Sequence, residues 1–264
     1  MPNNAPIAYN ESNSGFAATV LNNAQQRYEA PLVARLYLSD DTLLDRGTDD
    51  LLATVNLPAS ALPDSGGLEA NSQFEISFPA FTPSEDALPG SYTLIVDVFP
   101  EPDTIEKNPV DNVAATPIEV SGFDLDPGNG RIVGVDVDGG EPPHFPLGLE
   151  QTFSLQFDLA NLGEVDSRGD VTATVRLSTD DALGNDAFLG SFDLSTAISD
   201  ATPLGGGDTV SIVLNELSIS DQRPAGDYTI FVLVESDQTL LENELGNNSL
   251  AVPVSVSGPD LEIS

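Results

Sequence analysis

The chain has 264 residues, of which 43 are acidic and 8 are basic, and its formal net charge is −35. Cysteine is absent, so neither disulfides nor thiolate metal sites are available. So acidic a surface would repel phosphate backbones and anionic membranes, which disfavours nucleic acid and lipid headgroups as partners. The charge fits a salt-rich habitat, divalent-cation binding or colloidal solubility, and solubility is the simplest of the three.

The length allows one large or two ordinary domains, and the 40% hydrophobic residues can supply real cores. No apolar run approaches the length of a membrane span. The opening "MPNNAPIAYNES" lacks the basic start and apolar stretch of a signal peptide. We therefore expect a mature protein, an excised fragment or a substrate of a signal-free export route.

The predicted elements are strands throughout. In chain order, apolar and polar residues alternate with period two in "SYTLIVDV" (91–98), "TFSLQFDLAN" (152–161), "TATVRLS" (172–178) and "DTVSIVLNEL" (208–217). This alternation is typical of strands that bury one face. No stretch carries a helical apolar stripe, so the sequence predicts an all-β protein.

The chain contains two copies of one pattern. "PGSYTLIVDV" matches "AGDYTIFVLV", which aligns Tyr92 with Tyr228. The same offset carries "DNVAATPIEVSGFDL" (111–125) onto "NNSLAVPVSVSGPDL" (247–261) without a gap. We expect one domain over residues 1–121 and a second over 122–258. Residues 259–264 are then a strand that opens a further domain or is donated to a neighbouring subunit.

Each copy somewhat exceeds the ~100 residues of an immunoglobulin-like sandwich and carries about seven strand-like runs. A Gly-x-Tyr sequence opens a late strand in both copies, as in the tyrosine corner of such sandwiches. By strand alternation, two sets of residues would point inward: Tyr92, Leu94, Val96 and Val98, and Tyr228, Ile230, Val232 and Val234. The predicted fold is two tandem immunoglobulin-like β-sandwich domains.

These motifs resemble a known family. "RLYLS" or "VRLSTDD", "PGSYTL" or "AGDYTI", "IEKNPVDN" or "LENELGNN", and "PIEVSGFDL" or "PVSVSGPDL" together look like two tandem copies of the CARDB module, the cell-adhesion-related domain found in bacteria and also seen in archaea. The first copy departs from the pattern, with Pro109 and Asp111 where the second has Leu245 and Asn247. The resemblance implies immunoglobulin-like modules of large exported surface proteins and no catalytic residues.

The residues themselves offer little for catalysis. His144, the single histidine, lies in the loop-like "GGEPPHFPLG", which provides no rigid frame for a Ser-His-Asp arrangement. "GGGD" at Gly205 lacks the Lys-Ser/Thr of a phosphate-binding loop. Carboxylate pairs for glycoside hydrolysis remain open by count, but the chain has no Trp as a sugar platform. We predict that the protein is not an enzyme.

Acidic residues gather directly after the "LS" strand in both copies. They are Asp40, Asp41, Asp45, Asp49 and Asp50 in the first, and Asp180, Asp181, Asn185 and Asp186 in the second. Flexible oxygen-rich loops suit calcium, which takes six to eight oxygen ligands, although the spacing is not that of an EF-hand. Asp and Asn also form turns through side-chain-to-backbone bonds. Calcium is a candidate cofactor here, and turn formation is the favoured alternative.

A second oxygen-rich cluster lies where the copies join. Its members are Glu106, Asp111, Asn112, Asp124 and Asp126, with Glu242, Asn247, Asn248 and Asp260 as counterparts. We expect the Asn residues to satisfy a tight hairpin, and a calcium ion that stiffens the junction is the alternative. Asn10 and Asn247 begin glycosylation triplets. Lys107 lies at an expected hairpin tip, which does not suit an isopeptide cross-link.

The predicted function is a non-enzymatic structural or adhesion module of an exported cell-surface protein, located at the surface or outside the cell. Its partners would be copies of itself or adjacent domains of a longer chain. The alternative is an accessory module of a secreted hydrolase that binds polysaccharide or protein. An exposed aromatic row would favour this alternative, and an aromatic content of 6% argues mildly against it.

The two copies differ at their first strand. "GFDLDPGNGRIV" opens the second copy, whereas the first has only "MPNNAPIAYNESNS" before its matching strand "GFAATVLNNA". A further Asp-Leu strand, comprising Asp260, Leu261, Glu262 and Ile263, follows the second copy. One explanation is a fragment cut out of phase from a tandem array. The other is donation of this strand to a neighbouring chain by β-augmentation, which would propagate head to tail into a filament.

Overall fold

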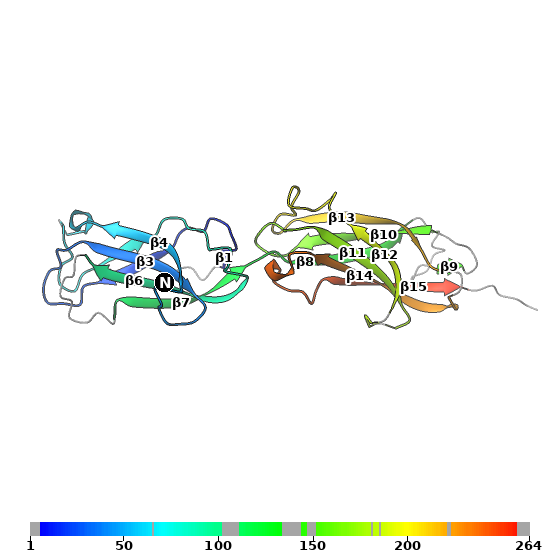
Figure 1. The fold of residues 1–264 in the computed structure, drawn as a ribbon, viewed down its shortest axis with the longest axis horizontal. Helices are drawn as coiled ribbons and strands as arrows, with labels where there is room; N and C mark the ends of the chain where they lie inside the picture. The colour runs from blue at the N-terminus through cyan, green and yellow to red at the C-terminus, as the bar shows by residue number, and fades with distance from the viewer. Residues whose placement is uncertain are drawn as a thin grey trace, which may run out of the picture. The chain divides into compact units, whose positions relative to one another are not determined.

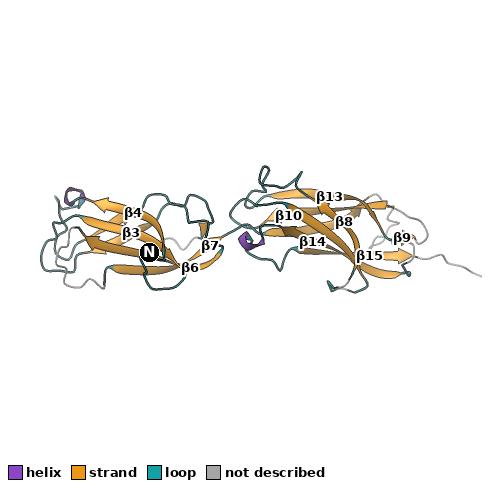
Figure 2. Ribbon diagram, in the orientation of Figure 1, coloured by secondary structure: helices purple, strands orange, loops and turns teal. Residues whose placement is uncertain are grey.

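The computed structural model describes residues 6–64, 66–101, 111–133, 144–146, 152–180, 182–184, 186–220 and 223–257. The chain divides into two compact units, Met1–Ser121 and Gly122–Ser264, and each is described by itself. The described ranges contain two complete 3-10 turns, Ala59–Ala61 and Thr239–Leu241 (Figure 2). None of the helical segments described is long and apolar enough to cross a membrane. The predicted all-β class is confirmed.

The first unit is an immunoglobulin-like sandwich of two sheets (Figure 1). Its strands are β1 (Ile7–Ala8), β2 (Ala17–Leu21), β3 (Leu32–Ser39), β4 (Asp50–Leu57), β5 (Gln73–Ser77), β6 (Gly90–Pro100) and β7 (Val113–Ser121). One sheet has the order β1-β7-β6-β3-β4, in which β1 pairs with β7 in parallel. The other consists of β2 paired with β5.

The second unit repeats this plan with one strand more among the described residues (Figure 1). Its strands are β8 (Leu125–Val133), β9 (His144–Pro146), β10 (Thr152–Asn161), β11 (Val171–Ser178), β12 (Ala187–Asp193), β13 (Thr209–Ser218), β14 (Gly226–Ser236) and β15 (Ser249–Ser257). The large sheet has the order β12-β11-β14-β15-β9. The small sheet has the order β13-β10-β8, so β10 is paired on both of its edges.

Strand register in the two units agrees with the sequence repeat. Tyr92 on β6 lies opposite Ile118, and Tyr228 on β14 lies opposite Val254. The repeat aligns Ile118 with Val254, so the two tyrosines have equivalent partners. Tyr228 Oη donates a 2.8 Å hydrogen bond to the Pro224 carbonyl, which lies upstream of it in the chain. This bond confirms the predicted tyrosine corner in the second unit.

The core of the second unit is complete, and that of the first is open on one side. Ile230, Val232 and Val234 are all 0% exposed, as predicted. The prediction is only partly right in the first unit, where Leu94 is buried but Val96 and Val98 are half-buried. The physical reason is coverage, because β8 closes the second sandwich and the described residues of the first unit contain no equivalent strand.

Candidate functional site at the free edge of strand β2

The acidic residues of the β3–β4 loop accept backbone hydrogen bonds. Asp41 Oδ1 accepts from the Leu43 amide at 2.6 Å, and Asp45 Oδ1 accepts from the Gly47 amide at 2.9 Å. The Asp49 carboxylate accepts from the amide of Asp45, and that of Asp50 accepts from Ser84. Asp40 lies exposed at the start of the same loop. Such bonds are the turn-forming chemistry of Asp.

The β11–β12 loop follows the same scheme where it is described. Asp180 Oδ1 accepts from the Ala182 amide at 3.0 Å, and Asp186 Oδ2 accepts from the Gly184 amide at 2.8 Å. The Gly184 bond lowers the pKa of Asp186. Asp181 and Asn185 lie outside the described residues. The described part of the chain has no group of three or more His, Asp or Glu side chains that could hold a metal ion, and calcium at these loops stays a prediction.

An asparagine that the sequence did not single out closes the end of the second sandwich. Asn161, at the end of β10, is 0% exposed. Its Nδ2 donates to the carbonyls of Val165 and Leu204, both at 2.8 Å. Its Oδ1 accepts from the amides of Gly163 at 3.1 Å and Asp124 at 3.0 Å. The last of these bonds attaches the start of β8 to β10.

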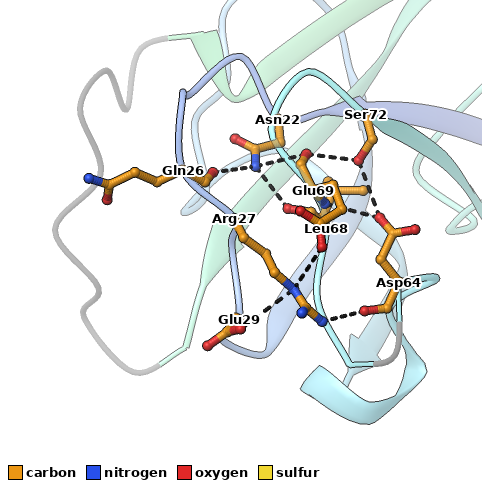
Figure 3. Close-up of polar contacts among 8 residues, drawn as sticks. All are labelled: Asn22, Gln26, Arg27, Glu29, Asp64, Leu68, Glu69 and Ser72. Atoms are coloured by element: carbon orange, nitrogen blue, oxygen red, sulfur yellow. Dashed lines mark hydrogen bonds and ion pairs between the residues drawn. The ribbon is translucent and has the colours of Figure 1, made fainter.

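Asn22 takes the same position in the first unit, directly after β2. Its Nδ2 donates to the carbonyls of Gln26 and Leu68 at 2.9 Å and of Glu69 at 3.2 Å (Figure 3). Its Oδ1 accepts from the Ala24 amide at 3.0 Å, as Asn161 accepts from Gly163. The bond that Asn161 receives from β8 has no counterpart at Asn22 among the described residues.

Charged groups fix the loops around Asn22 in place. Arg27 Nε lies 3.5 Å from a carboxylate oxygen of Glu29 and 3.4 Å from one of Glu69, and its Nη2 donates to the Asp64 carbonyl (Figure 3). The Asp64 carboxylate accepts from the Glu69 amide at 3.0 Å. These contacts connect Asp64 and Glu69 with Arg27, close to the end of β2.

The start of β8 is fixed at several points in the second unit. Besides its bond to Asn161, Asp124 accepts through its carbonyl from the Leu162 amide at 2.7 Å. The Leu125 amide donates to Glu242 Oε1 at 3.0 Å, and Phe123 and Leu125 are both 0% exposed. The backbone passes so close to Gly163 that a Cβ there would lie 2.4 Å from the Gly122 carbonyl oxygen.

The corresponding side of the first unit is an open edge. Among the described residues β2 pairs with β5 alone, and the edge it leaves free there is the one that β8 occupies on β10. Val20 on β2 and Val98 on β6 are half-buried, whereas their counterparts Leu159 and Val234 are 0% exposed. This open edge of β2, which carries Val20 and ends at Asn22, is the candidate functional site. Residues 260–263, which we predicted as the donor, lie outside the described residues.

The second unit contains a cluster whose grouping differs from the expected one, because Asp124 lies with Asn247 and Asn248 of its own unit. Asn248 Nδ2 donates to Glu242 Oε1 at 3.0 Å, and Asn247 Nδ2 donates to Asp124 Oδ1 at 3.0 Å. Glu242 is 7% exposed, and this burial raises its pKa. The hydrogen bonds from Leu125 and Asn248 lower the pKa of Glu242, and the negative charge of Asp124 raises it further. Of the counterparts in the first unit, Glu106 lies outside the described residues, as does Lys107.

One ion pair in the first unit was not expected from the sequence. Asp97 on β6 is 1% exposed, and it accepts from Arg46 Nε at 2.8 Å and Nη2 at 3.0 Å. The two residues are 51 positions apart, so only the fold brings them together. Since a buried carboxylate needs a partner of opposite charge, the largely exposed Arg46 serves to neutralise the buried Asp97.

Comparisons with known proteins show distant structural similarity only. No protein-family profile matches the sequence, and no curated protein matches it. The CARDB domain of the PF1109 protein from Pyrococcus furiosus, crystallised in complex with di-metal ions, is similar over 51% of this chain and 94% of its own, with 17% identity and a TM-score of 0.33. A Niemann-Pick type C2 protein from the Japanese carpenter ant is similar over 52% and 93%, with 10% identity and a TM-score of 0.35.

A β-glucosidase from Listeria innocua is similar over 54% of this chain but only 17% of its own, with 13% identity and a TM-score of 0.29. At these identities and TM-scores, none of the similarities assigns an activity or a ligand to the chain.

Proposed function

We propose that the chain is a non-enzymatic structural module of an exported cell-surface protein, built from two tandem CARDB-like domains. Its first domain accepts a β-strand from a second copy of the chain, and repetition of this contact joins copies head to tail. The observation that carries the proposal is the free edge of β2, where the second unit has β8. An unpaired edge beside half-buried apolar side chains is the kind of surface that strand addition uses.

The donor is residues 260–264, whose register follows from the repeat. Asn161 lies opposite Leu125 in the β10–β8 pairing, and Leu159 lies opposite Pro127. Carried over to the first unit, Asn22 faces Leu261 and Val20 faces Ile263 of the incoming chain. The Asp260 amide then donates to Asn22 Oδ1, as the Asp124 amide donates to Asn161. The pattern places Leu261 and Ile263 inward and Glu262 outward.

One difference limits the donor to these residues. Ala24 stands where the second unit has Gly163, the position at which a Cβ would collide with the Gly122 carbonyl and with Phe123 Cα. Residues before Asp260 must therefore approach by another path than Gly122 and Phe123 take. The bonds to Asn22 and the pairing along β2 do not depend on that path.

The joint has a modest affinity. Burial of Leu261 and Ile263 and the backbone bonds along β2 favour the contact, while the ordering of the donor residues opposes it. Association therefore depends strongly on protein concentration, and assembly should be measured up to about 1 mM chain, where even a millimolar contact is populated.

The test is sedimentation velocity and negative-stain imaging of four chains across that range. We expect the full chain to form assemblies that grow with concentration, and a chain without residues 260–264 to stay monomeric. Leu261→Asp should abolish assembly, since it places a charge in the buried position. Glu262→Gln is the matched control, because its side chain faces outward and the variant should assemble like the full chain.

A second measurement reads the acceptor directly. A peptide of residues 258–264, added to the chain that lacks 260–264, should shift the amide resonances of Asn22 and of β2 and leave those of β10 unchanged. A full chain that stays monomeric at about 1 mM, or a peptide that leaves β2 unchanged at millimolar concentration, refutes strand donation.

A further inference from the structure

Three buried oxygen atoms in the second unit have no hydrogen-bond partner among the described residues. They are Glu242 Oε2, Asn247 Oδ1 and Asn248 Oδ1. The side chains form two hydrogen-bonded pairs, in which Asn248 Nδ2 donates to Glu242 Oε1 and Asn247 Nδ2 donates to Asp124 Oδ1. The Leu125 amide, next to Asp124 in the chain, donates to the same Glu242 Oε1 and brings the two pairs together. Glu242 and Asn248 are 7% and 9% exposed, so bulk water does not reach them freely.

Leaving such oxygens unpaired costs free energy. A buried acceptor without a partner costs about 1–3 kcal/mol, and more when the group is charged. Asn247 and Asn248 each donate to a carboxylate through Nδ2, and no group among the described residues donates to the three remaining oxygens. A partner from outside the described chain would satisfy them. A cation suits a cluster that contains two carboxylates, Asp124 and Glu242, and no basic side chain. Water is the neutral competitor.

We propose that this cluster binds one calcium ion, held by Glu242, Asn248, Asn247 and Asp124. Carboxylate and amide oxygens are hard ligands of the kind that Ca²⁺ takes, and two carboxylates balance its charge. Water completes the six to eight ligands. The ion connects the first residues of the second domain, through Asp124, with the turn that follows β14, and it thereby fixes the start of β8.

The site is distinct from the loops after β3 and β11. Those side chains are exposed and already accept backbone amides, whereas the junction cluster is buried and carries unpaired oxygens. It is also independent of strand donation, because all four ligands lie within one unit and none lies on β2 or its free edge. Failure of one proposal leaves the other standing.

The experiment is a calcium titration of the full chain at constant ionic strength, followed by calorimetry and by hydrogen exchange. Calcium at about 100 times its Kd should raise the melting temperature of the second unit by about 5 °C or more, and a chelator should reverse the rise. Magnesium at the same concentration should give a smaller rise, because it gives up its bound water reluctantly. Exchange should slow in β8 and around Asn248 and stay unchanged in β2.

Variants locate the ion. Glu242→Gln and Asp124→Asn keep the size of each side chain and remove one charge, and both should lose the calcium response while remaining folded in chelator. If one of these two variants unfolds, the other still tests the loss of the calcium response. Asp41→Asn and Asp180→Asn, in the two acidic loops, are the matched controls and should keep the response.

Two results overturn the proposal. One is an unchanged melting temperature at about 10 mM calcium, which would leave water as the partner of these oxygens. The other is a response that survives in Glu242→Gln and Asp124→Asn, or that disappears in Asp41→Asn or Asp180→Asn, since either outcome places the ion elsewhere.

Discussion

Replacing Asn161 with Ala should destabilise the second unit far more than Asn22→Ala destabilises the first. Asn161 is 0% exposed and serves two carbonyls and two amides. Each buried backbone group left unpaired costs about 1–3 kcal/mol. Because some of these groups can shift toward water or other partners, we expect a total loss of about 3–5 kcal/mol. Asn22 is half-buried, so water replaces most of its bonds and the expected loss is about 1 kcal/mol.

The assay must separate the two units within one chain. Hydrogen exchange read by mass spectrometry does so, because peptides covering β10 and β14 report on the second unit and peptides covering β6 report on the first. Asn161→Ala should lower the free energy of opening in β10 and β14 and leave β6 unchanged.

The matched control is Asn215→Ala, an exposed asparagine on β13 whose side chain bonds only to Ser154 among the interactions shown. It should change the free energy of opening by less than about 0.5 kcal/mol. Two results would contradict this reasoning: a loss of free energy of opening in Asn161→Ala no larger than in Asn215→Ala, or no larger than the loss that Asn22→Ala causes in the first unit. Either would show that the hydrogen bonds of Asn161 to buried backbone groups do not stabilise the end of the sandwich.

Two further predictions concern charge. Arg46→Met should lower the unfolding free energy of the first unit by about 2 kcal/mol in urea, because it leaves the buried Asp97 carboxylate without its guanidinium partner. Arg35→Met should cost less, because the Arg35 guanidinium lies over the face of the Phe99 ring. Equal losses for the two variants would contradict this role. Raising sodium chloride from about 0.01 M to about 0.5 M should raise the melting temperatures of both units, because salt screens the repulsion among the carboxylates, which reaches ~30 Å at low salt. Unchanged melting temperatures would show that the acidic side chains are already well separated or paired.

The repeat carries most of the information about the fold. Period-two alternation gives the strands, and the constant offset between the copies gives matched registers on β6–β7 and β14–β15. β1 is different, because two residues, Ile7 and Ala8, are too short to show any period. Its parallel pairing with β7 is a tertiary contact that only the folded chain reveals.

The candidate site could be predicted in outline and not in detail. The missing counterpart of "GFDLDPGNGRIV" pointed to the first unit. The roles of Asn22 and Asn161 were hidden, because asparagine after a strand usually indicates a turn. Their equivalence shows only when "VLNNA" (20–24) is aligned with "LANLG" (159–163), at a slightly larger offset than the one that aligns the later strands. The bonds that distinguish these asparagines go to segments that are distant in the sequence.

The side chains along the open edge differ in a way that fits a short donor. In the second unit, β8 runs from Leu125, bonded to Glu242, to the region of Gly130, where a Cβ would lie 2.5 Å from Leu250 and 2.6 Å from Val252. The counterparts of those two residues in the first unit are the exposed Ala114 and the half-buried Thr116, which water can cover at little cost. Val20 keeps an apolar side chain at the end next to Asn22, where the proposed register places Leu261 and Ile263. Because the apolar part of the edge is confined to this end, a donor that contributes two inward side chains matches it better than a full-length copy of β8 would.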